Sequence, residues 1–481
     1  MIDVIVIGCG IVGAATAMEL SRYRLSVAVL EAENDVSVGT TKANSAILHA
    51  GYDPAHDTLM AKLNVEGVKL AKQLCTALDV PYKQVGSYVL AFAPDEEETL
   101  RALYANGVKN GVGGLALLSG NEVRAREPKL SPAVTLALYA PEAAIVSPWE
   151  YALALAETAV KNGVQLYLSH RVIGMEKISS GWRVTTDKGV FEARCVMNAA
   201  GVLAENVHNM AAKPSFTTKT SRGEYYLLDT AEGDTVHSVI FQCPNENGKG
   251  VLVSPTVHGN LIVGPNAAAS APTDTATTAE GLAFVSEMAK KSVPSVNLRA
   301  SIRNFAGVRA ATDKDDFIIE RAADGLIDIA GIKSPGLTAA PAIAKYAVQL
   351  LENEGIALRE KDDFVCQRTH VCFKELSNEQ KRELIAANPA YGRVICRCET
   401  VTEGEILESL RGPIPPVSLD GVKRRVRAGM GRCQGGFCGP RVLEILAREQ
   451  NIPDTAVLQD TSGTYILTGE TKAESTGEAN V

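Results

Sequence analysis

Four cysteines near the C-terminus have the most specific spacing in the chain. They form a C-x-C pair and a C-x4-C pair, made of Cys396, Cys398, Cys433 and Cys438. Both pairs are expected on loops that lead into helices, where backbone N–H groups stabilise thiolate charge and donate to metal-bound sulfur. Four thiolates can hold structural zinc or an iron–sulfur cluster. The spacing alone favours zinc, although the C-x-C pair is less typical of zinc sites, so both metals stay open.

A glycine-rich turn near the N-terminus has the spacing needed to bind a dinucleotide. Gly8, Gly10 and Gly13 follow the apolar run 3–7 and precede a stretch of good helix formers. A second apolar run ends at Glu31, whose carboxylate can accept hydrogen bonds from ribose hydroxyls and disfavours a 2′-phosphate. In this context the glycines allow a tight turn and let a pyrophosphate approach the helix N-terminus. The motif predicts FAD or NAD binding and does not separate the two.

Two later strand ends favour FAD. Residues 196–201 and 326–331 each read as a strand that ends at a glycine, and residues 334–338 lead into a predicted helix. Strands that return to one sheet from distant sequence predict a discontinuous nucleotide domain with a second domain inserted in it. The N-terminus of the helix after 334–338 carries partial positive charge that can face a reduced flavin.

The glycine turn with Glu31, and the segments 39–54, 196–201 and 331–341, resemble the D-amino-acid-oxidase-type FAD oxidoreductases. With its cysteine pairs, the chain is most similar over residues 1–465 to the large-subunit family of anaerobic glycerol-3-phosphate dehydrogenases. That family joins flavin domains to a domain like bacterioferritin-associated ferredoxin. The resemblance implies non-covalent FAD, a [2Fe–2S] cluster on the four cysteines, and oxidation of a secondary alcohol. It also implies onward electron transfer to further redox subunits or a quinone.

The resemblance also implies roles for individual residues. Oxidation of an alcohol by a flavin needs a base and cationic groups for an anionic substrate. His49 matches the family's active-site histidine and suits proton abstraction near neutral pH. Arg309 and Lys333 match family cations near the substrate. The positions expected to contact FAD are Gly8, Gly10, Ile11, Val12, Gly13, Glu31, Thr40, Thr41, Asn44, Ser45, Val172, Ala200, Gly201, Gly331, Gly336, Leu337 and Thr338.

Two features leave the substrate open between anionic alcohols. Asp53 stands where aerobic members of the family have an arginine that binds phosphate. Residues 222–226 and 334–336 are similar to L-2-hydroxyglutarate oxidases, in which case Arg222 and Tyr225 would hold a carboxylate. We expect oxidation of glycerol 3-phosphate to dihydroxyacetone phosphate, with a 2-hydroxy acid such as L-2-hydroxyglutarate as the alternative. Amine oxidation and a non-catalytic electron-transfer subunit are the remaining alternatives.

Composition limits the class of protein. The 481 residues carry a net charge of −8, which argues against nucleic-acid binding. There is no basic segment before an apolar stretch at the N-terminus and no apolar run of about 18 residues. We therefore expect a cytoplasmic protein without a membrane span, with peripheral membrane docking left open.

A basic group lies beside the second cysteine pair. Its members are Lys423, Arg424, Arg425, Arg427 and Arg432. Three interpretations apply: a solvated helix face with a cation-rich end, a docking patch for an acidic redox partner, or a means of raising the cluster potential.

The expected fold is α/β. A FAD-binding Rossmann-like domain over residues 1–353 should contain an inserted antiparallel-sheet substrate domain, built from about 83–150 and 213–305. Residues 354–390 are expected to form a linker and 391–459 a small helical ferredoxin-like [2Fe–2S] domain. Residues 460–481 are expected to form a tail, disordered after about residue 469 because little of it is apolar.

Overall fold

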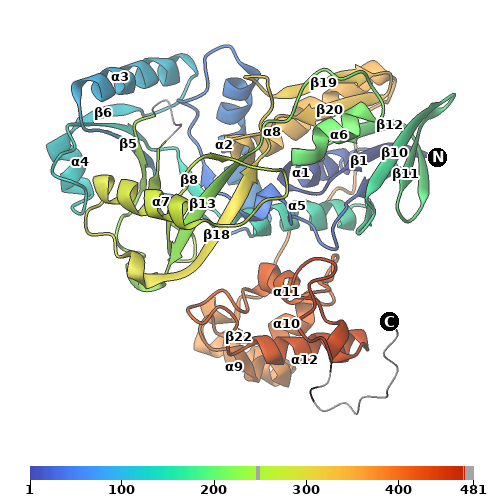
Figure 1. Cartoon of the computed structure of the whole chain (residues 1–481). Coiled ribbons are helices and arrows are strands. Elements are labelled where there is room, and N and C mark those ends of the chain that lie inside the picture. Colours follow the sequence, from blue (N-terminus) through green and yellow to red (C-terminus); the bar gives the residue numbers. More distant parts are fainter. Residues whose placement is uncertain (245–249, 470, 472–481) are drawn as a thin grey trace, which may run out of the picture. The chain divides into compact units, whose positions relative to one another are not determined.

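The computed structural model describes residues 1–244, 250–469 and 471 (Figure 1). The chain divides into two compact units. The first comprises Met1–Ala32 and Val36–Thr369, and the second comprises Glu33–Asp35 and His370–Val481. The disorder predicted after residue 469 falls almost wholly outside the described residues.

A parallel sheet forms the nucleotide-binding half of the first unit. Its central strand, β1 (Ile2–Ile7), lies between β2 and β12, and the order β9-β2-β1-β12-β20 is parallel throughout. The other four strands are β2 (Val27–Leu30), β9 (Gln165–Tyr167), β12 (Val190–Asn198) and β20 (Leu326–Ala330). The strands β10 (Val172–Ile178), β11 (Gly181–Thr186) and β19 (Ile318–Ala323) extend it in antiparallel fashion. β1, β12 and β20 come from three distant parts of the chain, so the predicted discontinuous nucleotide fold is confirmed.

Helices cover this sheet. α1 (Ile11–Leu20) is buried almost all round, because it packs against both α5 (Pro148–Lys161) and α8 (Gly336–Gln349). α8 also packs on α2 (Leu59–Ala77). A helix buried on all sides needs small apolar residues, and α1 reads IVGAATAMEL. The short helix α6 (Ala204–Asn209) follows β12.

The second sheet of this unit is mainly antiparallel. Its order is β17-β13-β16-β15-β14-β5-β7-β6, with β18 also paired to β13, and β14 and β5 are the one parallel pair among its described strands. Its strands are β5 (Ser87–Ala91), β6 (Ala116–Ser119), β7 (Leu136–Ala140), β13 (Ser221–Leu228), β14 (Val239–Gln242), β15 (Leu252–Pro255), β16 (Leu261–Gly264), β17 (Ala268–Ala269) and β18 (Ser301–Arg309). The predicted antiparallel insertion is therefore present, and its last strand runs on to Arg309.

Smaller elements complete the first unit. A three-stranded sheet contains β3 (Ile47–Leu48), β4 (Tyr82–Gln84) and β8 (Ala144–Val146). The helices on the second sheet are α3 (Pro94–Lys109), α4 (Gly120–Arg126) and α7 (Ala279–Ser292).

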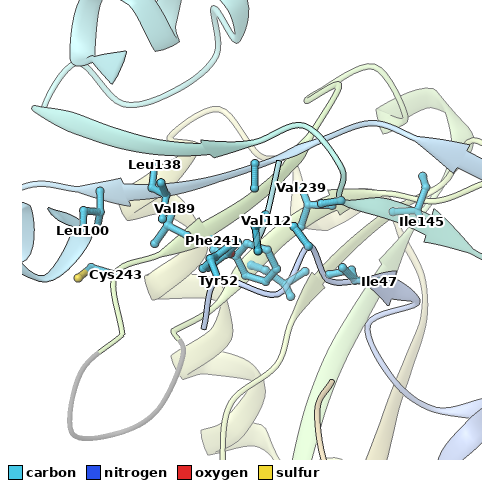
Figure 2. Packing of buried hydrophobic residues seen from close by; sticks show 14 of the residues in the cluster. Ile47, Tyr52, Val89, Leu100, Val112, Leu138, Ile145, Val239, Phe241 and Cys243 are labelled. Carbon is cyan, nitrogen blue, oxygen red and sulfur yellow. The ribbon is translucent and has the colours of Figure 1, made fainter. Parts of the chain in front are cut away.

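An apolar core lies against the second sheet (Figure 2). Val89, Leu138 and Val239 come from three neighbouring strands, while Tyr52 comes from the loop after β3. Phe241 of β14 belongs to the same core and is 6% exposed. This core fixes the position of the Phe241 ring, against which the candidate site is built.

The second unit is small and mostly helical. Its elements are α9 (Asn378–Ala387), β21 (Val394–Cys396), β22 (Val401–Thr402), α10 (Glu403–Ser409), α11 (Leu419–Val426) and α12 (Gly439–Gln450). α10 begins with the predicted capping box between Thr402 and Glu405. Ile406, Val422 and Leu446 are fully buried in its core.

Two expected boundaries differ in the structure. Residues 354–390 are not one linker, because the chain up to Thr369 belongs to the first unit and α9 forms in the second. The ion pair between Arg368 and Glu157 (2.7 Å) holds the first part in place. The folded chain also continues past residue 459, since Leu458 pairs with Tyr465 in a β-bridge. In the part of the chain that is described, no helix combines the length and apolarity that a membrane crossing requires.

Candidate flavin site and cysteine site

The predicted pyrophosphate turn has a geometry that only glycine can adopt. Gly8 has φ +97°, and a Cβ there would lie 2.6 Å from the carbonyl oxygen of Ala199. A Cβ on Gly13 would lie 2.0 Å from the carbonyl oxygen of Gly8. The turn therefore packs directly on the end of β12 and leaves no room for a side chain at Gly8 or Gly13.

Polar groups on both sides of this turn are already ordered. The Glu31 carboxylate, at the end of β2, accepts a hydrogen bond from the Cys9 N–H at 2.6 Å. The Thr41 hydroxyl accepts one from the Ile11 N–H at 2.9 Å, at the N-terminus of α1. An acid at the strand end and N–H groups at the helix start are the partners that a ribose and a pyrophosphate require, so these residues fit the predicted dinucleotide.

The segment with Thr40 and Thr41 is fastened to the second sheet. It forms a short 3-10 helix, η1 (Thr40–Lys42), and the Thr40 hydroxyl donates to the carbonyl of Val308 at 2.7 Å. A Cβ on Gly307 would lie only 1.8 Å from the carbonyl oxygen of Ala43. Asn44 closes this turn by donating to the Thr41 carbonyl at 2.8 Å.

The predicted loop at Ala200 and Gly201 is held by a chain of buried polar side chains. The Asn198 side chain accepts from the Ala200 N–H at 3.3 Å and donates to Asp328 at 2.8 Å. Asp328 in turn meets His208 Nδ1 at 2.5 Å. Burial raises the pKa of the Asp328 carboxyl against the opposing effect of these partners. These hydrogen bonds join β12 to β20 beneath the loop.

His49 is oriented by groups from several elements. Its ring stacks on Phe241, with centroids 5.7 Å apart and an interplanar angle of 27°. Ser334, in the loop before α8, places its hydroxyl 3.3 Å from Nε2. The His49 backbone donates to the Thr338 hydroxyl (2.8 Å) and accepts from the Asn64 side chain (3.0 Å). A fixed imidazole beside a predicted flavin suits a proton acceptor.

Tyr225 and Arg309 share one face of the second sheet. Tyr225 stacks on Phe305 with centroids 4.8 Å apart, and its hydroxyl lies 3.1 Å from that of Ser45. Burial raises the pKa of the Tyr225 phenol, so it stays neutral. Arg309 donates to the Ser221 hydroxyl (3.3 Å) and to the Asn266 carbonyl (3.0 Å). The site thus combines an oriented cation with a neutral hydroxyl.

Arg222 does not join this group. It lies three residues from Tyr225 in β13, and side chains separated by an odd number of positions point to opposite faces of a strand. On its own face Arg222 pairs with Asp274 (2.5 Å) and Glu224 (3.2 Å). The structure therefore places Arg222 and Tyr225 on opposite faces of β13, which gives no support to a carboxylate held by both.

The remaining predicted residues are placed as follows. Lys333 is half-buried in the loop between β20 and α8, where its carbonyl accepts from the Gly336 N–H at 2.7 Å. Gly331 begins this loop with φ +66°. Val172 is the first residue of β10 and packs against the apolar cluster that contains Ile5, Leu30 and Val184. Asn64 and Phe241 were not predicted, because neither lies in a motif and both reach His49 through the tertiary fold.

The four cysteines form two pairs of unequal exposure. Cys396 and Cys438 are 1% and 2% exposed, whereas Cys398 and Cys433 are exposed, with their Sγ atoms 3.8 Å apart. The Cys438 thiol, helped by N–H groups of Gly429 and Glu399, lowers the pKa of Cys396 to about 6. Across the described residues, no three side chains of His, Cys, Asp or Glu converge on a single metal position. Cysteine sulfurs that accept hydrogen bonds from backbone N–H groups are nevertheless typical ligands of an iron–sulfur cluster.

The predicted basic patch is mostly neutralised. Arg424 and Arg425 are buried, and both bind the carboxylate of Asp35 at 2.9 Å. Lys423 lies 3.5 Å from Asp420, and Arg427 lies 3.1 Å from Glu399. Neither a solvated face nor a docking patch describes these four cations. Arg432 is exposed, on the loop of the second cysteine pair.

Comparison with known families finds two matches. The model of the family described as FAD dependent oxidoreductase matches residues 3–350, and that of the BFD-like [2Fe-2S] binding domain matches residues 394–448. A glycerol 3-phosphate dehydrogenase of Caloramator mitchellensis is 49% identical over 98% of this chain and 100% of its own length.

More distant relatives cover the first unit. A glycerol 3-phosphate oxidase of Mycoplasma genitalium is 32% identical over 73% of this chain and 94% of its own. An L-2-hydroxyglutarate dehydrogenase of Indibacter alkaliphilus is 29% identical, over 65% and 76%. Among solved structures, the dithionite-reduced L-alpha-glycerophosphate oxidase of Mycoplasma pneumoniae with FAD bound has a TM-score of 0.72 and 31% identity, covering 76% of this chain and 98% of that one.

Proposed function

This chain belongs to the FAD dependent oxidoreductase family, and from that premise we propose that it oxidises glycerol 3-phosphate to dihydroxyacetone phosphate. The observation that carries the proposal is the 49% identity to a glycerol 3-phosphate dehydrogenase along almost the whole chain, cysteine domain included. The electrons leave through the C-terminal [2Fe–2S] domain to a further redox component, either a protein subunit or a quinone.

Each cofactor has a set of residues that would hold it. The glycine turn and the start of α1 would bind the FAD pyrophosphate, and Glu31 the ribose. The segments at Thr40–Ser45, Ala200–Gly201 and Gly336–Thr338 would border the rest of the flavin, and the four cysteines would hold the cluster. When bound, FAD takes up the carbon-bound hydrogen of the alcohol with its two electrons, and the cluster carries electrons singly.

The residues of the chain itself supply binding and proton transfer. His49 accepts the hydroxyl proton at Nε2, the ring atom near Ser334. Arg309 orients the anionic substrate, since its planar guanidinium matches phosphate oxygens. The neutral Tyr225 hydroxyl supplies a hydrogen bond beside it, and Lys333 adds positive charge from the loop before α8. Asp53, which stands in place of a family arginine, leaves Arg309 and Lys333 as the cations proposed for the phosphate.

The alternative substrates have less support. The L-2-hydroxyglutarate interpretation placed the substrate carboxylate on Arg222 and Tyr225 together, but the Arg222 side chain lies on the opposite face of β13 from Tyr225 and is paired to two acids. A non-catalytic relay subunit would have no use for a histidine held by Ser334, Thr338 and Asn64.

Anaerobic titration with separate substrates tests the proposal. The purified holoenzyme is mixed without oxygen with glycerol 3-phosphate, and in a second experiment with L-2-hydroxyglutarate, while flavin absorbance is followed. We expect glycerol 3-phosphate alone to bleach the flavin. Bleaching by the 2-hydroxy acid alone would overturn the substrate assignment, and bleaching by neither would favour a relay subunit.

A further inference from the structure

The four-cysteine site is open to solvent at one edge. Cys396 and Cys438 are buried in the second unit, while Cys398 and Cys433 lie exposed on the two cysteine loops. Because electron transfer between proteins falls off with distance, an exposed pair of cluster ligands is the natural point of exit for electrons. This edge is therefore where a partner can approach.

A large apolar side chain stands at the same edge. Phe437 is 65% exposed, and its backbone N–H is directed at the Cys433 sulfur. The Arg397 guanidinium lies 5.0 Å from the centroid of the Phe437 ring. Covering this ring with a partner's apolar surface would remove it from water, which favours association.

The charge around this edge is positive. Arg397 and Arg432 are exposed on the first and second cysteine loops. The acid in the segments 394–401 and 427–440 is Glu399, whose side chain is 10% exposed and pairs with Arg427 at 3.1 Å. A partner that docks here meets the exposed Arg397 guanidinium over the Phe437 ring and a second exposed arginine, Arg432, which is next to Cys433 in sequence, and acidic surfaces complement these cations.

We propose that Arg397, Arg432, Phe437 and the exposed cysteines Cys398 and Cys433 form an exit patch for an acidic one-electron carrier protein. The partner covers Phe437 with apolar surface and faces the two arginines with carboxylates. One electron passes from the reduced cluster to the carrier, so the cluster is oxidised as the carrier is reduced. This inference rests on the proposed function, because the electrons originate in substrate oxidation.

Two haem proteins of opposite surface charge serve as probes. The holoenzyme is reduced with dithionite, so that the test does not depend on the identity of the substrate, is freed of excess dithionite by anaerobic gel filtration, and is mixed with acidic cytochrome b5 or basic cytochrome c. Haem reduction gives the rate, and calorimetry of the oxidised proteins gives the affinity. The variants are Arg397→Glu, Arg432→Glu and Phe437→Ala. Arg382→Glu on α9 and Tyr465→Ala match them as exposed changes in the same unit outside the patch.

The expected result is a charge-dependent pattern. Each arginine reversal should slow reduction of cytochrome b5 about tenfold at low salt and weaken its binding, while it speeds reduction of cytochrome c. Phe437→Ala should weaken the b5 complex several-fold with little salt dependence, and the two matched variants should change neither rate. Equal rates for all proteins would overturn the proposal.

A second outcome would also overturn it. If the patch variants slowed cluster reduction by substrate but left both haem reactions intact, these residues would serve electron entry. Failure of the proposed function is separable, because it appears as an unbleached flavin with glycerol 3-phosphate whatever the carrier does.

Discussion

His49 is a residue whose environment fixes both its ring plane and its backbone. The ring rests on Phe241, Nε2 faces Ser334, and the backbone is bound by Thr338 and Asn64. His49→Ala removes the proton acceptor, and because general-base catalysis typically contributes a factor of about 10²–10⁴, we expect flavin bleaching to slow by at least 100-fold. Stopped-flow mixing with substrate, together with the FAD content of the purified variant, measures this. His56→Ala, an exposed histidine nearby, is the control. Loss of FAD along with activity would indicate a structural role for His49.

Arg309 and Arg222 lie on the paired strands β18 and β13, and variants of the two test which face of the second sheet binds the substrate. Arg309→Gln should raise the KM for glycerol 3-phosphate at least tenfold, because the guanidinium fork is lost on the site face. Arg222→Gln should leave KM unchanged and lower the melting temperature, because Glu224 and Asp274 lose the cation between them, at a cost of about 3 kcal/mol. Steady-state kinetics of both variants give KM, and thermal unfolding gives the melting temperature. A raised KM in Arg222→Gln would contradict the placement.

Individual site residues differ in how far the sequence alone reveals them. His49 and Arg309 lie in short segments that resemble a known family, so their proposed roles came from that resemblance. The spacing of Arg222 and Tyr225 already contained the evidence against their pairing, since an odd offset in a strand separates them. Phe241 and Asn64 belong to elements distant in sequence, and only packing brings them to the histidine.

At the scale of elements, β18 and the short helix η1 approach too closely for a side chain between them. A Cβ at Gly307 would overlap the Ala43 carbonyl oxygen at 1.8 Å, and backbone atoms on both sides cannot move independently. Gly307→Ala should therefore displace Thr40–Ser45, lower the FAD content and destabilise the first unit by about 1–3 kcal/mol or more.

The ratio of FAD to protein after gel filtration and the melting temperature measure the effect of this change. Gly189→Ala is the control, because no atom lies within 4 Å of its added Cβ and its backbone is not left-handed. Full FAD content and unchanged stability in Gly307→Ala would show that the strand and the helix separate easily.

Whole elements were predictable where propensity and motif agree. The β1–turn–α1 segment and the capping box at Thr402 are local patterns, and both form as expected. α9 was missed because its surface is polar and none of its residues is buried, so its sequence shows little hydrophobic periodicity. Leu458 pairs with both Ser418 and Tyr465, so this structure depends on the rest of the second unit and could not be predicted from the terminal segment alone.

At the scale of the whole molecule, the three residues 33–35 belong to the C-terminal unit although they follow β2 in sequence. Asp35 is 1% exposed and binds both Arg424 and Arg425 there. Burial acts to raise the pKa of Asp35, but the two guanidinium groups outweigh it and hold the pKa below its usual range. A carboxyl with a depressed pKa in the folded state stabilises it above the unfolded pKa of about 3.9, and the contribution is lost as pH falls below that value.

Asp35→Asn should therefore destabilise the second unit at neutral pH. The substitution keeps the shape but leaves two buried guanidinium groups without their carboxylate, and breaking a buried pair in this way costs about 3–5 kcal/mol. Thermal unfolding followed by the visible circular dichroism of the iron–sulfur chromophore reports on this unit, while flavin fluorescence reports on the other. Asp460→Asn removes a more exposed partner of Arg424 and should cost less.

Because the Asp35→Asn variant has already lost the carboxylate, its stability should fall less between pH 6 and pH 3 than that of the wild type. An equally steep acid dependence in both proteins would show that other carboxyls control acid unfolding of this unit.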